Sequence, residues 1–338
     1  MKKILFVGGM VLLFVYASGQ QRVSVDSVYH LIKVNNVHTR SADWKQIDEG
    51  FRKKLAGAKT DVDSIRSLVY VFEQLKDYHS SISYKNNYFS NYPDFDEATM
   101  NYLRPLVGLS QSRTNTFTAL TLEDQFVYLQ IPGVTAYGEQ TAVFAQRLSD
   151  TLCKYVQKGT KGIILDLRLN GGGQFSSMAS GVAPLLGDIY IGGGINSNND
   201  QIMSFRLKNG NITMNNYPLT AIKHTTSLDL SKLPVVLILG PATRSSGSIL
   251  AVAFKSRPKT YFIGEPTASG YTTSNDYFYL NENLSLNLST AFTIDRNNKV
   301  YKEVVEPDEL LKSPDNFDDI KLDTKVKKGL LWLKQNSR

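Results

Sequence analysis

The stretch PVVLILGPATRSSGSILAVAF, residues 234–254, decides the fold class. Its first part, residues 234–239, is an apolar run with the length of a buried strand, and it stops at Gly240-Pro241. A second apolar run covers residues 246–255 and is typical of a helix that packs against a sheet. A strand, a short loop and a helix in this order form the unit from which mainly parallel α/β sheets are built.

The same alternation extends on both sides of this stretch. Strands are predicted at residues 126–131, 162–167 and 261–263, and helices at 140–157, 176–186 and 322–333. Between residues 271 and 305 the pattern favours antiparallel strands with a turn at 295–298. We therefore predict an α/β core at 115–312, followed by a C-terminal helical segment at 313–338.

The part of the chain before the core has a different pattern. An apolar stripe from Ile65 to Leu75 has helical spacing, with Asp61 and Asp63 as possible caps, and it predicts a helical segment at 20–85. Residues 86–100 are rich in Tyr, Phe, Asn, Asp and Pro, a composition that predicts an irregular loop, and we take the loop region as 86–114.

The composition excludes several classes of protein. Of the 338 residues, 42% are apolar and 20% are charged, which is close to an average globular chain and far from a disordered one. The single cysteine, Cys153, and four dispersed histidines predict neither a disulfide framework nor a metal cofactor. The net charge of +7 is spread along the chain, so nucleic acid is not an expected partner.

The first nineteen residues have the pattern of a secretory signal peptide. Lys2 and Lys3 precede an apolar run at 4–16, and small residues follow at 17–19. The run is shorter than the about 20 residues that span a bilayer. We expect an exported protein, periplasmic or extracellular, without membrane attachment after cleavage, and an uncleaved anchor is the alternative.

Two loops follow predicted parallel strands and therefore lie at the same edge of the sheet, where open α/β sheets bind ligands. The first, DLRLNGGGQ at 166–174, lacks the spacing of a phosphate-binding loop. It is either a tight turn or a set of backbone N–H donors for an oxyanion. The second places Ser245 at a helix N-terminus, where serine is either a common cap or a nucleophile.

Five segments in order carry a resemblance to a known family. They are LKDYHSS at 75–81, VYLQIP at 127–132, DLRLNGGG at 166–173, TRSSGS with GEPTASG at 243–248 and 264–270, and VYKEVVEPDE at 300–309. The chain resembles the serine peptidases of the C-terminal processing (tail-specific) peptidase and tricorn-core superfamily. This resemblance implies a ClpP/crotonase-like β-β-α core, no cofactor, and a peptide or unfolded protein as substrate. The segment after His79 is too short for the PDZ domain that many relatives carry, and the resemblance leaves the oligomeric state open.

The resemblance also implies roles for individual residues. Ser245 matches the nucleophile, and the backbone N–H groups of Ser246 and of Gly172 or Gly173 match the oxyanion hole. No lysine lies between residues 259 and 299, so the lysine base of one branch is missing. His79, in the DYHS context of the tricorn-like branch, is the expected base, because imidazole titrates near neutral pH.

A third group should orient the imidazole, and the sequence leaves its identity open. Glu306 is the first candidate, and Glu303 and Asp77 are the others. Two residues depart from the family pattern: Ser248 replaces a glutamate and Arg244 replaces an alanine. These departures keep open an alternative function, a catalytically impaired protein that binds peptides or other ligands on the same scaffold.

Overall fold

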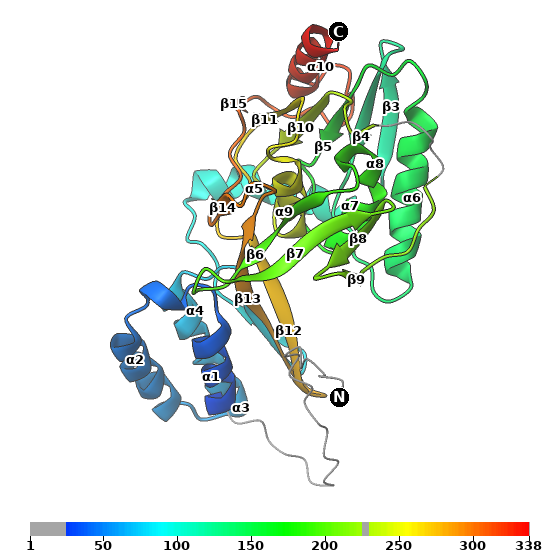
Figure 1. Cartoon of the computed structure of the whole chain (residues 1–338). Helices are drawn as coiled ribbons and strands as arrows, with labels where there is room; N and C mark the ends of the chain where they lie inside the picture. The colour runs from blue at the N-terminus through cyan, green and yellow to red at the C-terminus, as the bar shows by residue number, and fades with distance from the viewer. Residues whose placement is uncertain (1–24, 225–229, 338) are drawn as a thin grey trace, which may run out of the picture.

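The computed structural model describes residues 25–224 and 230–337 (Figure 1). The predicted signal peptide at 1–19 lies outside the described residues. Within the described ranges, no helix combines the length and the apolar composition needed to cross a membrane. The chain forms a group of N-terminal helices, a nine-stranded sheet and a six-stranded sheet, with further helices around the sheets.

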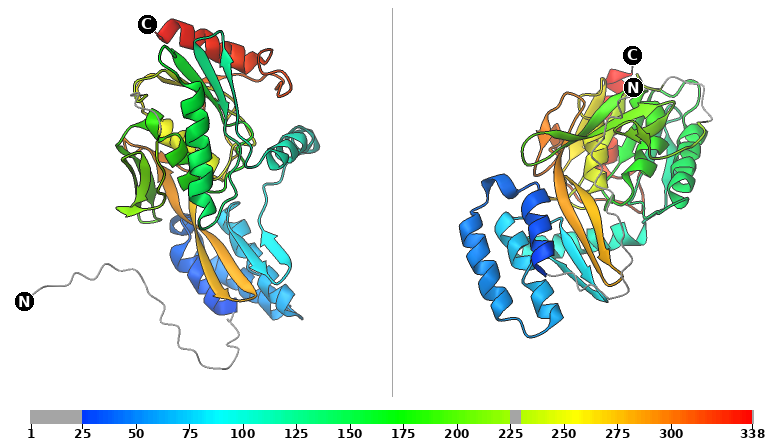
Figure 2. Two further views of the ribbon diagram at one scale, coloured as in Figure 1. Left: turned by 90° about the vertical axis from the view of Figure 1, so that its right-hand side faces the viewer. Right: turned by 60° about the horizontal axis from the view of Figure 1, so that its bottom comes forward.

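The N-terminal helices pack together at one end of the molecule, away from the six-stranded sheet (Figure 2). They are α1 (Val25–Asn35), α2 (Trp44–Ala56), α3 (Asp61–Arg66) and α4 (Val69–Leu75). The predicted stripe at 65–75 is helical but divided between α3 and α4. The cap of α3 is Thr60, whose side chain forms a capping box with Asp63, rather than Asp61 or Asp63 themselves.

The prediction of an irregular loop at 86–114 is wrong. This region contains the short strand β2 (Asn87–Ser90) and a sixteen-residue helix, α5 (Glu97–Ser112). Asp96 caps the helix by accepting a hydrogen bond from the Thr99 N–H at 2.7 Å. Pro105 lies inside the helix, although proline in a helix interior removes a backbone hydrogen bond.

The six-stranded sheet contains the strands predicted at 126–131, 162–167, 234–239 and 261–263. Its order is β15-β11-β10-β5-β4-β3, with all neighbours parallel except β3 and β4. The strands are β3 (Thr118–Leu122), β4 (Phe126–Gln130), β5 (Gly162–Asp166), β10 (Val235–Leu239), β11 (Thr260–Gly264) and β15 (Glu309–Leu310). The central strands β4, β5 and β10 are buried along their whole length, as their continuous apolar runs predict.

Helices cover both faces of this sheet. One face, with Leu165 and Leu237, packs in the main core with α6 (Gln140–Tyr155), α7 (Phe175–Gly181), α8 (Ala183–Leu186) and α9 (Ser246–Phe254). The other face, with Ile164 and Val236, packs against α10 (Thr324–Asn336). The alternation of buried residues between two cores explains why both faces of these strands are apolar.

The nine-stranded sheet joins the N-terminal helices to the core. Its order is β2-β1-β13-β6-β7-β8-β9, and β12 and β14 also pair with β13. The new strands are β1 (Ser81–Tyr84), β6 (Tyr190–Ile195), β7 (Gln201–Lys208), β8 (Asn211–Met214), β9 (Tyr217–Pro218), β12 (Thr273–Asn281), β13 (Leu284–Ile294) and β14 (Val300–Tyr301). Leu286 and Leu288 of β13 pack in the core of the N-terminal helices, whereas Phe292 pairs with Ile195 of β6.

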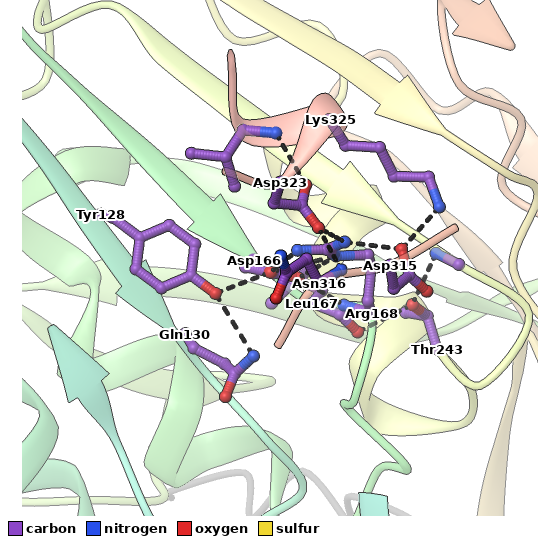
Figure 3. A network of polar contacts seen from close by, with 12 residues as sticks. Tyr128, Gln130, Asp166, Leu167, Arg168, Thr243, Asp315, Asn316, Asp323 and Lys325 are labelled. Carbon is purple, nitrogen blue, oxygen red and sulfur yellow. Dashed lines mark hydrogen bonds and ion pairs between the residues drawn. The ribbon is translucent and has the colours of Figure 1, made fainter. Parts of the chain in front are cut away.

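A buried ionic network attaches the C-terminal segment to the sheet (Figure 3). Arg168, directly after β5, forms ion pairs with Asp166 at 2.6 Å, Asp315 at 2.6 Å and Asp323 at 2.8 Å. Lys325 of α10 binds Asp315 at 2.6 Å. We call these residues the Arg168 network. It fixes the chain segment that follows β5 and leads into the glycine loop at 171–173.

Candidate active site

The structure brings Ser245 and His79 together from distant parts of the chain. Ser245 directly precedes α9, and His79 lies in the loop between α4 and β1. The distance between His79 Nε2 and Ser245 Oγ is 2.9 Å, which is within hydrogen-bond range. This is the geometry required of a nucleophile and its general base.

The backbone of Ser245 is unusual for a helix cap. Its φ of 54° and ψ of −129° place it in a region that residues other than glycine rarely adopt. Its side chain makes no capping hydrogen bond to α9 and is directed to His79 instead. The strained turn is fixed by the Ser245 N–H, which donates to the Tyr271 carbonyl at 3.0 Å. The capping interpretation of Ser245 is therefore wrong.

The glycine loop lies directly against Ser245. A Cβ on Gly172 would come within 2.7 Å of the Ser245 Cβ, and Gly172 has φ of +98°, so glycine is required there. The Gly172 N–H is already used, because it donates to Asn170 Oδ1 at 3.0 Å. The Gly173 and Ser246 N–H groups meet no acceptor among the described residues. Of the predicted oxyanion donors, Gly173 and Ser246 are therefore the available pair.

The other ring nitrogen of His79 contacts a threonine. His79 Nδ1 lies 2.8 Å from Oγ1 of Thr273 on β12, and the Tyr271 ring packs edge-on against the imidazole at 5.3 Å. The expectation that Glu306 orients His79 is not met. Glu306 is exposed, and its backbone carbonyl accepts from Lys255 Nζ.

The alternative candidate Glu303 does not form a hydrogen bond with His79 either. Its carboxylate accepts from Ser269 Oγ at 3.3 Å. The sequence does not point to Thr273, because hydroxyl residues are common in strands and no local pattern marks this one. The third early candidate, Asp77, lies two residues before His79 and is fully buried.

Burial sets the protonation state of His79. The pKa of the imidazole is lowered from 6.5 to about 4: burial is the largest cause, the charge of Asp77 opposes it, and the charge of Arg244 adds to the lowering. At neutral pH the imidazole is thus uncharged and able to accept a proton. The departure at Arg244 has a direct electrostatic consequence, because a cation close to His79 disfavours the imidazolium ion.

The second departure from the family pattern has a different location. Ser248 is fully buried in α9, where its hydroxyl lies 3.5 Å from the Thr243 carbonyl oxygen. Arg244 is half-buried, with its guanidinium carbon 5.8 Å from the centre of the Tyr271 ring. Neither residue interrupts the hydrogen bond between Ser245 and His79.

A cavity of about 620 Å³ opens at the pair. Its lining includes the apolar residues Phe175, Met203, Phe205, Met214, Leu219 and Ile249. Exposed tyrosines border it, namely Tyr137, Tyr277 and Tyr279. Within the described ranges, no group of three His, Cys, Asp or Glu side chains is arranged to bind a metal ion. The site thus consists of a serine, a neutral imidazole, free N–H donors and a largely apolar cavity.

Comparison with known proteins assigns this arrangement to a family. The sequence model described as peptidase family S41 matches residues 125–311, more than half of the chain. The chain belongs to peptidase family S41. It is thereby a serine-type peptidase by family, and the fold class that the resemblance implied is confirmed.

Individual known proteins are similar over most of the chain. The nisin-resistance protein of Lactococcus lactis subsp. lactis is 26% identical over 272 residues, which are 80% of this chain and 77% of that protein. A lipoprotein from Streptococcus agalactiae has a similar structure, with a TM-score of 0.66 and 21% identity over 92% of this chain and 95% of that chain. Mature CPAF has a TM-score of 0.55 at 10% identity, covering 93% and 97% of the two chains.

Proposed function

We propose that this S41 peptidase hydrolyses peptide bonds through an acyl-enzyme on Ser245, with His79 as the general base. The observation that carries the proposal is the 2.9 Å hydrogen bond between His79 Nε2 and the hydroxyl of a serine held in a strained turn. Burial supports the role of His79, since it keeps the imidazole neutral at physiological pH.

The proposed reaction has two halves that use the same groups. His79 Nε2 accepts the Ser245 proton as Oγ bonds to the scissile carbonyl carbon, and the carbonyl electron pair moves to its oxygen. The imidazolium then gives its proton to the amine nitrogen, the C–N bond breaks, and an ester remains on Ser245. In the second half, His79 deprotonates a water that attacks this ester; the imidazolium then returns the proton to Ser245 Oγ as the ester C–O bond breaks and the acid leaves.

The negative oxygen of each intermediate is assigned to the N–H groups of Gly173 and Ser246. Ser246 is the first residue of α9, where the helix dipole favours negative charge. The Ser246 hydroxyl donates to the Gly173 carbonyl at 2.6 Å, which holds the two loops in register. Preformed donors stabilise the developing charge without reorganisation, and one such donor contributes about 10²–10³-fold to kcat.

The cavity supports an extended peptide or an unfolded protein as substrate. Its lining includes Gly173 and Ser246 together with the apolar residues Phe175 and Ile249, which supports an apolar environment for the side chain whose carbonyl occupies the oxyanion site. Strand β12 pairs only with β13 among the described strands, and its outer edge borders the cavity. An open edge of this kind binds extended backbone by adding a strand.

The proposal is tested with a serine-directed phosphonate probe and a peptide hydrolysis assay. The expected result is probe attachment at Ser245, located by peptide mass spectrometry, with no labelling and no turnover in Ser245→Ala. A Ser269→Ala variant serves as the control, because its hydroxyl bonds Glu303 outside the proposed machinery. If peptides bind to the wild type without labelling or turnover, the impaired binding protein is the correct alternative.

Export is a separate part of the proposal, and it rests on the pattern of residues 1–19. Its expected outcome is a mature protein that has lost this segment and occurs outside the cytoplasm. N-terminal sequencing of the protein from its native host tests this directly, and a full-length cytoplasmic chain would contradict it.

A further inference from the structure

A chain of hydroxyl groups leads away from His79 into the protein. His79 Nδ1 lies 2.8 Å from Thr273 Oγ1, and Thr273 Oγ1 lies 3.2 Å from the Oγ of Ser289 on β13. Ser289 Oγ in turn donates to Asp77 Oδ1 at 3.0 Å. Thr273, Ser289 and Asp77 are at most 1% exposed, so water does not compete for these contacts.

The side-chain carboxylate of Asp77 accepts every hydrogen bond that it makes. Its donors are the N–H groups of His79 and Ser80, the Ser80 and Ser289 hydroxyls, and the Asn36 side-chain amide. A carboxylate surrounded by donors alone satisfies them in its ionised form. No lysine or arginine is paired with Asp77 among the described residues, so its negative charge has no fixed counter-ion.

Each hydroxyl has a single proton, and this fixes the direction of the chain. Because Asp77 is an acceptor, the Ser289 proton is directed to it, and Ser289 Oγ then accepts the proton of Thr273. The second acceptor near Thr273 is Asn275 Oδ1 at 3.2 Å, and it also draws the Thr273 proton away from His79. Thr273 therefore accepts from Nδ1–H, which leaves the lone pair of His79 on Nε2, next to Ser245 Oγ.

We propose that Asp77 is the positioning carboxylate of this centre and that it acts on His79 through Ser289 and Thr273. The chain holds the imidazole in the tautomer and orientation that accept the Ser245 proton. It also places a negative charge beside the imidazolium that forms in the reaction. No proton moves along it. The inference rests on the proposed peptidase activity and supplies the orienting group that Glu306 does not provide.

The test compares three variants of buried threonines. Thr273→Val keeps the shape of the side chain and removes the hydroxyl, and Thr273→Ser restores the hydroxyl. Thr293→Val is the matched control, because Thr293 is equally buried at 1% exposure but bonds the Thr272 carbonyl. We expect Thr273→Val to lower kcat about 10- to 100-fold with little change in KM, since the tautomer of the base is no longer fixed. Thr273→Ser should recover most of this loss.

The pH profile separates a positioning role from a structural one. In Thr273→Val the imidazolium loses the acceptor for its Nδ1 proton, so the acidic limb of kcat/KM should move to lower pH. Ser289→Ala interrupts the chain one step further and should show the same shift with a smaller loss of kcat. It provides an independent test if Thr273→Val fails to fold.

The outcomes distinguish the two proposals. If the wild type hydrolyses peptides and is labelled at Ser245 while Thr273→Val and Ser289→Ala match it in kcat and pH profile, the positioning chain is refuted and the peptidase mechanism stands. If both variants lose activity only in proportion to their folded fraction, measured by circular dichroism, the role is structural and the inference also fails. If the wild type is neither labelled nor active, the proposed function itself is wrong.

Discussion

Two buried carboxylates, Asp166 and Asp77, are the centres of two polar networks with different partners. Asp166 is bonded by the guanidinium of Arg168, and the Arg168 network contains further ion pairs to Asp315 and Asp323 (Figure 3). Asp77 is equally buried but is bonded by hydroxyl, amide and backbone N–H groups. In the first network the carboxylates are paired with fixed cations. The second network has no cation among the described residues and connects Asp77 through Ser289 and Thr273 to His79 at the cavity.

The difference explains what each network does. Each carboxylate of the Arg168 network is paired with a fixed cation, so the network joins β5 to the C-terminal segment. The negative charge of Asp77 is compensated only by dipoles, so it favours a positive charge on the nearby imidazole. A buried carboxylate thus supports structure when it has its own cation, and catalysis when the reaction supplies the cation.

Removing the guanidinium of the Arg168 network should have the largest effect on stability. Arg168→Leu leaves three buried carboxylates without their common partner, so we expect a loss of about 3–5 kcal/mol in the free energy of unfolding. Denaturant titration measures it. The control is Lys334→Met, which breaks the exposed pair with Glu123 and should cost at most about 1 kcal/mol. Similar losses in the two variants would show that the network is not needed for stability.

Acidification should affect the two networks in separate pH ranges. The folded-state pKa of His79, about 4, is lower than its ordinary value of 6.5, so protonation favours the unfolded chain. The stabilisation by neutral His79 is complete above pH 6.5 and is lost as the pH falls towards 4. Although burial opposes it, Arg168 lowers the pKa of Asp323 below 3.8, so this contribution is lost only in more acidic solution.

Stability and activity measured against pH test these ranges. The free energy of unfolding should fall between pH 6.5 and 4 in the wild type but not in His79→Gln, with a further fall below 3.8 in both. The acidic limb of kcat/KM should lie near pH 4 to 5 in the wild type. A limb at 6.5 or higher would contradict the electrostatic account of the site.

The smallest effect is expected at Glu306. Its side chain is exposed and is remote from the hydrogen bonds of His79, so Glu306→Gln should keep kcat and kcat/KM within about twofold, as is usual for surface substitutions. Peptide hydrolysis assays on the variant and the wild type give the answer. A loss of a hundredfold or more would show that Glu306, rather than the Asp77 chain, orients the base.

The sequence was sufficient to predict the central parallel strands and the antiparallel strands after residue 271, but not the other strands of the second sheet. The central strands are continuous apolar runs, which have few alternative interpretations. Strand β6 contains three consecutive glycines, which are unfavourable in strands by propensity. They are needed because the strands approach closely: a Cβ on Gly192 would lie 2.3 Å from the Ile294 carbonyl oxygen.

The candidate site was predictable to the extent that its residues belong to local patterns. Ser245 and the glycine loop follow strands of one parallel sheet, and the resemblance supplied His79. Thr273, Ser289 and the bonds of Asp77 depend on pairing between β12 and β13 and on the packing of these strands against the N-terminal helices. No local pattern distinguishes these hydroxyl residues from the many others in the same strands.

The central claim is that His79 deprotonates Ser245, and the kcat of His79→Ala for peptide hydrolysis tests it most directly. With Ser245→Ala as the inactive reference and the fold verified by circular dichroism, kcat should fall by a factor on the order of 10²–10⁴. KM should change little, because the proton transfer occurs in the transition state. Equal kcat values for the wild type and His79→Ala across pH 5 to 9 would contradict the claim.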